Sequence, residues 1–154
     1  MNIYIYMKTH KGKFKPQHPE KYKGDPTNII YRSGWERKVM VWLDTNPNIL
    51  KWNSEEIIIP YVKPTDNRVH RYFPDFYALM ITKDNRTKEV ILEIKPKKET
   101  KEPVRKKRVT KQYINEVVTW GVNQAKWKAA QEYCSDRGWE FHLITEDHLN
   151  LWYK

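Results

Sequence analysis

Three charged residues stand inside apolar segments in the middle of the chain, where a plain strand needs none. Asp75 follows Pro74 in one such segment, and Glu93 and Lys95 lie in the next. An unneutralised charge among apolar side chains is costly and requires a partner. Two acids that approach each other raise each other's pKa values unless a cation lies between them. The pattern therefore indicates a site for a divalent ion, and the chemistry that suits such a site is phosphodiester hydrolysis.

The segments that carry these residues are expected to form a hairpin. Residues 71–82 and 88–95 are rich in β-branched and aromatic residues, which is typical of strands. The KDNRT stretch between them contains the Asn and Asp that suit a tight turn. Folding back about this turn brings Asp75 within a few residues of Glu93 on the adjacent strand, where paired residues have Cβ atoms about 5 Å apart.

The second strand should present Glu93 and Lys95 on one face, because alternate side chains of a strand point the same way. Magnesium accepts one or two carboxylates, keeps several waters and takes its remaining ligands from substrate phosphates. A lysine beside such an ion can hold or help deprotonate the attacking water. The alternative is an exposed same-face pair on a solvated hairpin, with Asp75 simply following a proline in a turn. The spacing alone is compatible with both, and the apolar context favours the site.

A third acid, Glu36, has two interpretations that the sequence leaves open. An amphipathic helix is predicted by apolar residues at helical spacing, namely Trp35, Val39, Trp42 and Leu43. Ser33 can cap this helix, and Asn46 with Pro47 ends it. Ser33 to Glu36 also fits a capping box, in which the glutamate bonds back to the amide of the cap. Glu36 could equally point across the sheet as a third carboxylate.

The remaining segments complete an expected order of helix, three strands, helix, strand and helix. Residues 54–62 are short and β-branched, which predicts a strand. The pattern beyond residue 111 is helical, with a break at Gly121 and a second helix capped by Asn123 as one interpretation, and Gly138 is placed to close the last turn. WEFHLIT predicts the last strand, and Thr145 can cap a short terminal helix. The predicted fold class is α/β or α+β, with a small mixed sheet flanked by helices.

Length and composition favour one folded domain over residues 1–154. A chain of 154 residues is too short for two comfortable cores, and with 39% hydrophobic and 14% aromatic residues it is too apolar to be disordered. A basic extended N-terminal segment, about 1–28, and a basic loop, about 96–111, are the expected additions to the core. The N-terminal segment is rich in Pro, Gly and Lys, so we expect it to drape over the surface or to stay mobile until it meets a partner.

The charge balance points to a polyanion as partner. Lysine and arginine number 29 against 19 acidic residues, a net charge of +10, and residues 95–111 alone hold nine basic and two acidic residues. Nucleic acid is the leading candidate. No apolar run approaches the roughly 20 residues of a membrane span, and the N-terminus lacks a signal-peptide core, so we expect a soluble intracellular protein. Cys134 stands alone, which excludes an intramolecular disulfide and a cysteine-based zinc site.

Basic residues around the proposed site are expected to contact DNA phosphates without choosing bases. They are Arg32, Arg71, Lys97, Lys98, Lys101, Arg105, Lys106, Lys107 and Arg108. The alternative is a solvated loop that only keeps the protein soluble. Tyr31 and Tyr72 are candidates for stacking on bases or sugars. Most tryptophans stand at core spacing and are expected to pack, among them Trp35, Trp42, Trp127 and Trp139.

The motifs resemble those of a known group, the PD-(D/E)xK nuclease superfamily. They are RSGWE on the first helix, PD at Pro74 and Asp75, and EIK from Glu93 to Lys95. The glutamate on the helix is similar to the variant in transposon-end endonucleases. Over nearly the whole chain, ordered blocks resemble the head completion proteins of T-even-type tailed phages. These blocks are KYKGDPTNIIYRSGWERKVMVWLDTNPNILKW, SEEIIIPY, EIKPKKET, KWKAAQEYC and FHLITED.

This resemblance implies a restriction-endonuclease-like fold and a magnesium-dependent endonuclease acting on double-stranded DNA, with manganese able to substitute. When the roles known in the family are assigned to the matching positions of this sequence, Asp75 and Glu93 bind the metal, with help from the backbone carbonyl of Ile94. Lys95 serves the nucleophile, and Glu36 completes the acidic cluster. The resemblance also implies work with phage head or neck proteins, in the virion or in the host cytoplasm during assembly.

The resemblance leaves alternatives open. The same cleft could grip a DNA end without cutting it, as a structural plug of the phage head would, and a recombination or repair nuclease is a third interpretation. Gln124 and Lys126 lie where some members of the superfamily carry a helper polar residue on the following helix. The sequence does not define the cleavage pattern, the neck partner or the oligomeric state.

Overall fold

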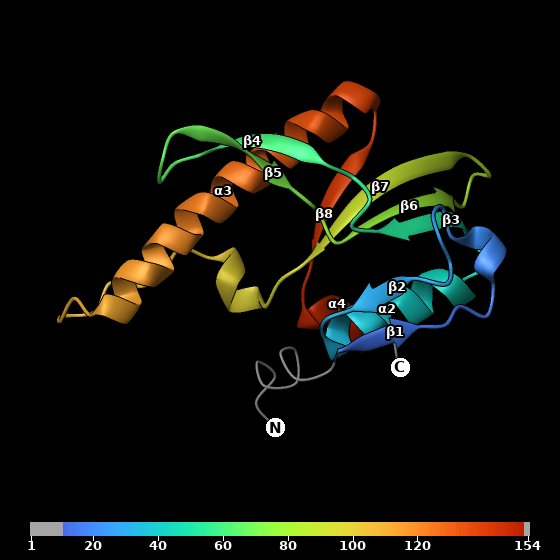
Figure 1. Cartoon of the computed structure of the whole chain (residues 1–154), viewed down its shortest axis with the longest axis horizontal. Coiled ribbons are helices and arrows are strands. Elements are labelled where there is room, and N and C mark those ends of the chain that lie inside the picture. Colours follow the sequence, from blue (N-terminus) through green and yellow to red (C-terminus); the bar gives the residue numbers. More distant parts are fainter. Residues whose placement is uncertain (1–10, 153–154) are drawn as a thin grey trace.

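The computed structural model describes residues 11–152, which are built around a four-stranded sheet (Figure 1). The strands are β3 (Ile49–Ser54), β6 (Phe76–Ile81), β7 (Thr87–Ile94) and β8 (Glu140–Ile144), in the spatial order β3-β6-β7-β8. The pairs β3–β6 and β6–β7 are antiparallel, whereas β7–β8 is parallel. The sheet is therefore mixed, as predicted.

One face of the sheet is covered by elements from both ends of the chain. They are β1 (Gly12–Phe14), the 3-10 turn η1 (Pro19–Lys21), β2 (Ile29–Tyr31), α2 (Gly34–Thr45) and α4 (Glu146–Trp152). The apolar stripe of α2 packs here, with Val39, Met40 and Leu43 fully buried against the β7 residue Leu92. Trp52 is also fully buried and meets the ring of Tyr22 edge to face, with centroids 4.8 Å apart.

The opposite face is covered by a second hairpin and the long helix. They are β4 (Ile59–Lys63), β5 (Arg68–Tyr72) and α3 (Lys111–Arg137), with the short 3-10 turn η2 (Lys97–Thr100) between the sheet and α3. Trp127, Ala130 and Cys134 of α3 pack on Ile91 of β7. The second half of α3 lies over the sheet, and its first half projects away from the body (Figure 1). No helix among residues 11–152 is long and apolar enough to cross a lipid bilayer.

The predicted hairpin and first helix are confirmed. β6 and β7 form the hairpin, and its turn is closed by the Thr82 N–H, which donates to the Arg86 carbonyl at 2.7 Å. Ser33 caps α2, because its Oγ accepts a hydrogen bond from the Glu36 N–H, and Asn46 ends the helix. The four tryptophans expected to pack do so: Trp35 and Trp127 are buried, and Trp42 and Trp139 are partly buried against the two core clusters.

The prediction of a single strand over residues 54–62 is wrong. β3 ends at Ser54, residues 55–58 are irregular, and β4 begins at Ile59 and pairs with β5 instead of the central sheet. The predicted strand 71–82 is likewise interrupted between Tyr72 and Phe76. Pro74 explains this break, since proline lacks the N–H that a ladder needs and also restricts the residue before it.

The predicted break of the long helix at Gly121 is also wrong. α3 runs through Gly121 without interruption, and a Cβ at this position would meet nothing within 4 Å. A glycine in a helix interior costs only about 1 kcal/mol relative to alanine, so packing further along the helix can override it. Gly138 ends α3 as predicted, with φ of 70°. α4 follows Thr145, but the threonine hydroxyl lies 3.3 Å from Nδ1 of His148 rather than on a backbone N–H.

The described part of the basic N-terminal segment is docked onto the core, which corrects the expectation of a draped or mobile segment. Phe14 and Tyr22 are buried in the cluster beneath α2. The buried carboxylate of Asp44 accepts hydrogen bonds from the N–H groups of Gln17 at 2.7 Å and His18 at 3.0 Å. The segment is therefore held by two aromatic anchors and one buried acid. Residues 1–10 lie outside the described residues.

Candidate active site

Asp75 and Glu93 lie side by side where β6 begins and β7 ends. The register pairs Phe76 with Leu92, so one further step along both strands places Asp75 opposite Glu93. The Asp75 N–H donates to Oε2 of Glu93 at 3.3 Å, and the Ile94 N–H donates to Oδ2 of Asp75 at 2.8 Å. The hairpin thus brings the two predicted acids together and holds each through a backbone amide of the opposite strand.

Glu93 is fixed from two further directions. The Tyr72 hydroxyl donates to Oε2 at 2.6 Å, and Nζ of Lys95 lies 3.9 Å from Oε1. Glu93 and Lys95 share the face of β7 that carries Ile91, as the alternation of the strand predicts. One oxygen of Glu93 is therefore bound by the protein, and the other faces the lysine.

Burial gives this pair of acids unusual electrostatics. Burial is the main cause that raises the pKa of Asp75 well above its usual range, and the charge of the neighbouring Glu93 carboxylate adds to it. The hydrogen bond from the Ile94 N–H and the charge of Lys95 oppose this rise. Burial also raises the pKa of Glu93, against the Tyr72 hydroxyl and Lys95. Two close carboxylates that resist ionisation are stabilised by a cation placed between them.

The structure supports the capping interpretation of Glu36, and within residues 11–152 it does not bring Glu36 into a group of three metal-ligating side chains with Asp75 and Glu93. The side chain belongs to the N-terminal cap of α2, although it accepts from the Arg32 N–H at 3.1 Å, one residue before the cap itself. Burial raises the pKa of Glu36. The hydrogen bond from the Arg32 N–H opposes this rise, and the charge of Glu55 adds to it. The charge of Glu36 in turn raises the pKa of Asp75. Glu36 therefore caps the helix and also contributes negative charge to the site.

The donor atoms fit a magnesium ion. Oδ1 of Asp75 and Oε1 of Glu93 accept no hydrogen bond from any group within residues 11–152. No three His, Cys, Asp or Glu side chains in this part of the chain form a ready-made metal cluster. Magnesium in proteins is commonly bound by one or two carboxylates, and waters and substrate oxygens complete its coordination shell. Ile94 contributes its N–H to Asp75, and its carbonyl is the further ligand that the resemblance implies.

Sequence reasoning assigned Tyr72 wrongly. Only 3% of its surface is exposed, and its hydroxyl is bound to Glu93, so its ring is not available for stacking on bases. Tyr31 is partly buried against the core. No local pattern marks Tyr72 as a partner of Glu93, because the contact depends on how the β4–β5 hairpin lies over the central sheet.

Lys126 of α3 adds a second ammonium group near the acids. Its Nζ lies 5.6 Å from the centre of the Tyr72 ring and 5.8 Å from that of Tyr61. Burial, together with the charge of Lys95, lowers the pKa of Lys126, and the charge of Lys126 in turn opposes the rise in the pKa of Glu93. Gln124, the other residue suggested on this helix, is exposed.

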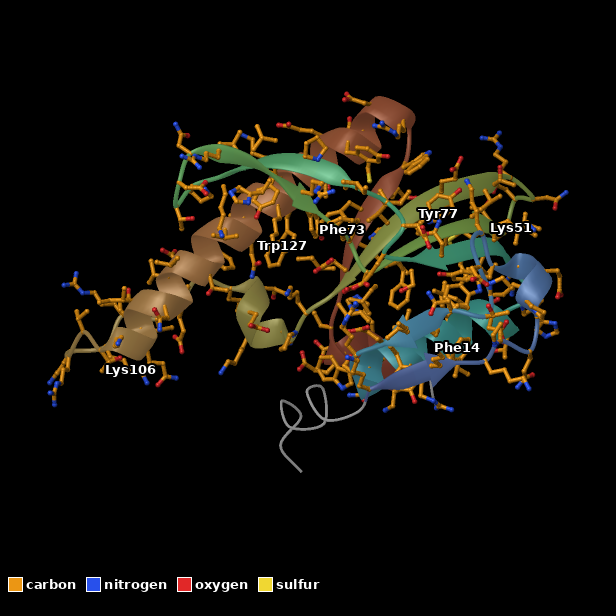
Figure 2. The ribbon with its side chains drawn as sticks, in the orientation of Figure 1. Phe14, Lys51, Phe73, Tyr77, Lys106 and Trp127 are labelled. Carbon is orange, nitrogen blue, oxygen red and sulfur yellow. The ribbon has the colours of Figure 1, made fainter. Side chains whose placement is uncertain are left out.

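The predicted DNA-binding residues fall into separate groups. Lys97 lies in η2, where it pairs with Asp147 of α4 at 3.0 Å. A groove of about 720 Å³ between η2 and the first half of α3 is lined in part by Lys98, Lys101 and Lys111. The segment around Lys106 lies at the outer tip of the molecule, far from Phe73 beside the acidic pair (Figure 2). The exposed residues of this tip are Arg105, Lys106, Lys107 and Arg108.

The two predicted DNA-binding arginines outside this loop have protein partners. The guanidinium of Arg71 lies 5.9 Å from the centre of the Phe73 ring. Arg32 forms an ion pair with Glu55. Sequence reasoning missed Glu55, which directly follows β3 and whose N–H donates to the Asp75 carbonyl at 3.1 Å.

Comparison with known proteins defines the class. Residues 46–146 match the family model described as TnsA-like endonuclease N terminal, a range that contains Asp75, Glu93 and Lys95. The chain therefore belongs to the TnsA-like endonuclease family, and its mixed sheet flanked by helices is the restriction-endonuclease-like fold. The chain is also similar to the head completion nuclease of Enterobacteria phage T4. The two are 44% identical over 144 residues, which cover 91% of this chain and 93% of the relative. The resemblance drawn from the sequence is confirmed.

Proposed function

We propose that the protein is a magnesium-dependent endonuclease that hydrolyses phosphodiester bonds of double-stranded DNA with little sequence readout. The observation that carries this proposal is the close pair of half-buried Asp75 and buried Glu93, with Lys95 alongside. Burial raises the pKa values of both acids, and the charge of Glu93 raises that of Asp75 further. Acids with pKa values perturbed in this way cluster at functional sites. A divalent cation and a phosphate group together supply the missing charge balance.

Each side chain of the site has a role in this reaction. A bound magnesium ion would polarise the phosphate and neutralise charge that develops on it. Asp75 and Glu93 would hold the ion through the oxygens that face away from their backbone partners. Tyr72 keeps Glu93 oriented through the bond to Oε2. Lys95, whose Nζ lies 3.9 Å from the other oxygen, would orient the attacking water or a phosphate oxygen.

Binding of DNA would rest on phosphate contacts. Exposed basic residues lie in η2, in the groove and in the projecting tip around Lys106, which Figure 2 shows far from Phe73. Exposed lysines and arginines on a loop contact the backbone of DNA more readily than they read base edges. This arrangement supports cutting with little sequence preference and a strong dependence of binding on salt.

The relative's name supports a role in completing the phage head. We infer that this chain acts in the virion or in the host cytoplasm during assembly, beside a head or neck protein. A structural plug that grips DNA ends without cutting, or a repair nuclease, would carry the same basic surface. The presence of the protein in purified particles separates a head protein from a repair enzyme.

A plasmid assay tests the catalytic proposal. Wild-type protein with magnesium or manganese should convert supercoiled plasmid to nicked and linear forms. Asp75→Asn and Lys95→Ala should reduce the rate at least about 100-fold, because each removes a group that acts on the reacting phosphate. The exposed residues Asp136 and Lys83 supply matched controls, and Asp136→Asn and Lys83→Ala should cut normally. Wild-type protein that binds DNA but never cuts it, with both site variants still completing heads, would establish the plug instead.

A further inference from the structure

Glu55 has an unusual backbone conformation at the edge of the acidic site. It follows directly after β3 and has φ of 56°. Among residues 11–152, the other non-glycine residues with positive φ are Asn67 and Asn85, and asparagine adopts this region readily. A glutamate does so only where its surroundings hold it there, and such positions cluster at functional sites.

This conformation gives Glu55 two partners in the site. Its N–H donates to the Asp75 carbonyl at 3.1 Å, and its side chain forms an ion pair with the Arg32 guanidinium. The N–H of Arg32 in turn donates to Oε2 of Glu36. One chain of contacts thus runs from Asp75 through Glu55 and Arg32 to Glu36, and it joins β6 to the start of α2.

The ion pair in this chain of contacts is open to solvent. The side chain of Arg32 is 53% exposed and that of Glu55 is 36% exposed. An exposed ion pair is only slightly more stable than its two charged side chains separated in water. The planar guanidinium group binds a phosphate through two parallel hydrogen bonds, as it binds a carboxylate. A phosphate that reaches the acidic site can therefore compete with Glu55 for Arg32.

We propose that Arg32 exchanges partners when DNA binds: Glu55 holds its guanidinium in the free protein, and a backbone phosphate replaces Glu55 in the complex. This inference rests on one part of the proposed function, namely that the protein binds DNA. Glu55 then has two effects on Arg32. It places the guanidinium beside Asp75 and Glu36 before DNA arrives, and it lowers the affinity for DNA by the amount needed to release the arginine.

The first test compares Glu55→Gln with Glu56→Gln. Glu56 is the exposed neighbour of Glu55, and its substitution makes the same change of charge one residue away, without touching the pair. Binding is measured by fluorescence anisotropy on a labelled duplex of mixed sequence, with EDTA present so that no cutting occurs. Glu55→Gln should tighten binding about two- to fivefold, the range expected for releasing one exposed ion pair. Glu56→Gln should change binding by clearly less.

The second test asks whether Glu55 acts through Arg32. Arg32→Ala should make the plot of log affinity against log salt less steep by about 0.9, since one phosphate contact is lost. In the Arg32→Ala background, Glu55→Gln should no longer tighten binding. Circular dichroism and thermal melting of each variant check that the fold is kept.

Three results would overturn the exchange. One is equal tightening by Glu55→Gln and Glu56→Gln, which would show an effect of net charge alone. Another is an effect of Glu55→Gln that persists in the Arg32→Ala background. The third is an unchanged salt slope in Arg32→Ala. Because these measurements use binding without metal, a protein that binds DNA but never cuts it would refute the nuclease and leave the exchange standing.

Discussion

Replacing Asp75 by asparagine should stabilise the metal-free protein while abolishing its activity. The amide oxygen of asparagine can still accept the hydrogen bond that the Ile94 N–H donates at 2.8 Å. The substitution removes one of two carboxylates that lie against each other, Asp75 half-buried and Glu93 buried. Loss of that repulsion should outweigh the small change in shape.

The expected gain follows from the burial of the pair. Two unit charges about 5 Å apart repel by about 3 kcal/mol at an effective dielectric constant near 20. Replacing a buried ion pair by apolar residues of similar volume is often neutral or stabilising by about 1–4 kcal/mol, which shows how much the burial of charge can cost. Partial protonation already relieves part of the repulsion, so we expect about 1–3 kcal/mol at neutral pH. For a chain of this size that corresponds to a rise in Tm of roughly 3–9 °C.

The gain should depend on pH in a defined direction. Because burial and Glu93 raise the pKa of Asp75 above its ordinary value of 3.8, the folded protein holds this proton more tightly than the unfolded chain. Wild-type stability should therefore fall as the pH rises from about 4 through the raised pKa. Asp75→Asn lacks this contribution. The difference in stability between the variant and wild type should be small near pH 4 and should grow toward pH 7.

Thermal melting followed by circular dichroism, in EDTA from pH 4 to pH 8, measures this difference. Asp136→Asn, at an exposed position on α3, is the control and should match wild type throughout. Magnesium should raise the Tm of wild type more than that of Asp75→Asn. A variant that is less stable than wild type at pH 7, or a difference that does not change with pH, would refute the assignment of Asp75 and Glu93 as a repelling pair.

Three further predictions concern other parts of the structure. Tyr72→Phe removes the 2.6 Å hydrogen bond to Glu93 and should weaken manganese binding about tenfold in calorimetry; unchanged affinity would contradict its positioning role. Ser33→Ala removes the cap of α2 and should cost about 1 kcal/mol in urea unfolding, whereas no loss would mean that the cap contributes nothing. Gly121→Ala should stabilise α3 by up to about 1 kcal/mol, while Gly138→Ala should destabilise it by a similar amount because φ there is 70°. Equal effects of the two glycine substitutions would contradict this account.

The centre of the site could be predicted from the sequence because it depends on local rules. A hairpin with a short polar turn fixes its own register, and the register alone places Asp75 opposite Glu93. Alternation along the strand then puts Lys95 on the same face as Glu93. The cap of α2 is equally local, since Ser33 and Glu36 lie within one turn.

The surroundings of the site could not be predicted because they depend on contacts between distant segments. Tyr72 reaches Glu93 only because the β4–β5 hairpin lies over the central sheet together with α3. Glu55 turns into a left-handed conformation that no glutamate prefers, and its partners, Arg32 after β2 and Asp75 before β6, come from two other segments. Neither residue has a neighbour in sequence that signals its role.

The N-terminal segment was misjudged for a related reason. Its composition of Pro, Gly and Lys is typical of a flexible segment, yet two aromatic residues within it, Phe14 and Tyr22, are enough to anchor it in the core. The acid that accepts hydrogen bonds from the backbone of this segment is Asp44. It lies in the last turn of α2, at the opposite end of the helix from the Ser33 cap that the sequence predicted. Composition describes the average residue of a segment, whereas docking depends on a few.

The most direct test of the central claim is a crystal of the protein soaked in manganese and measured for anomalous scattering. The account predicts one peak between Asp75 and Glu93, within about 2.2 Å of a carboxylate oxygen of each, and no such peak in Asp75→Asn. A wild-type crystal with manganese bound elsewhere, or with none at this pair, would contradict the claim that the two acids share a catalytic metal.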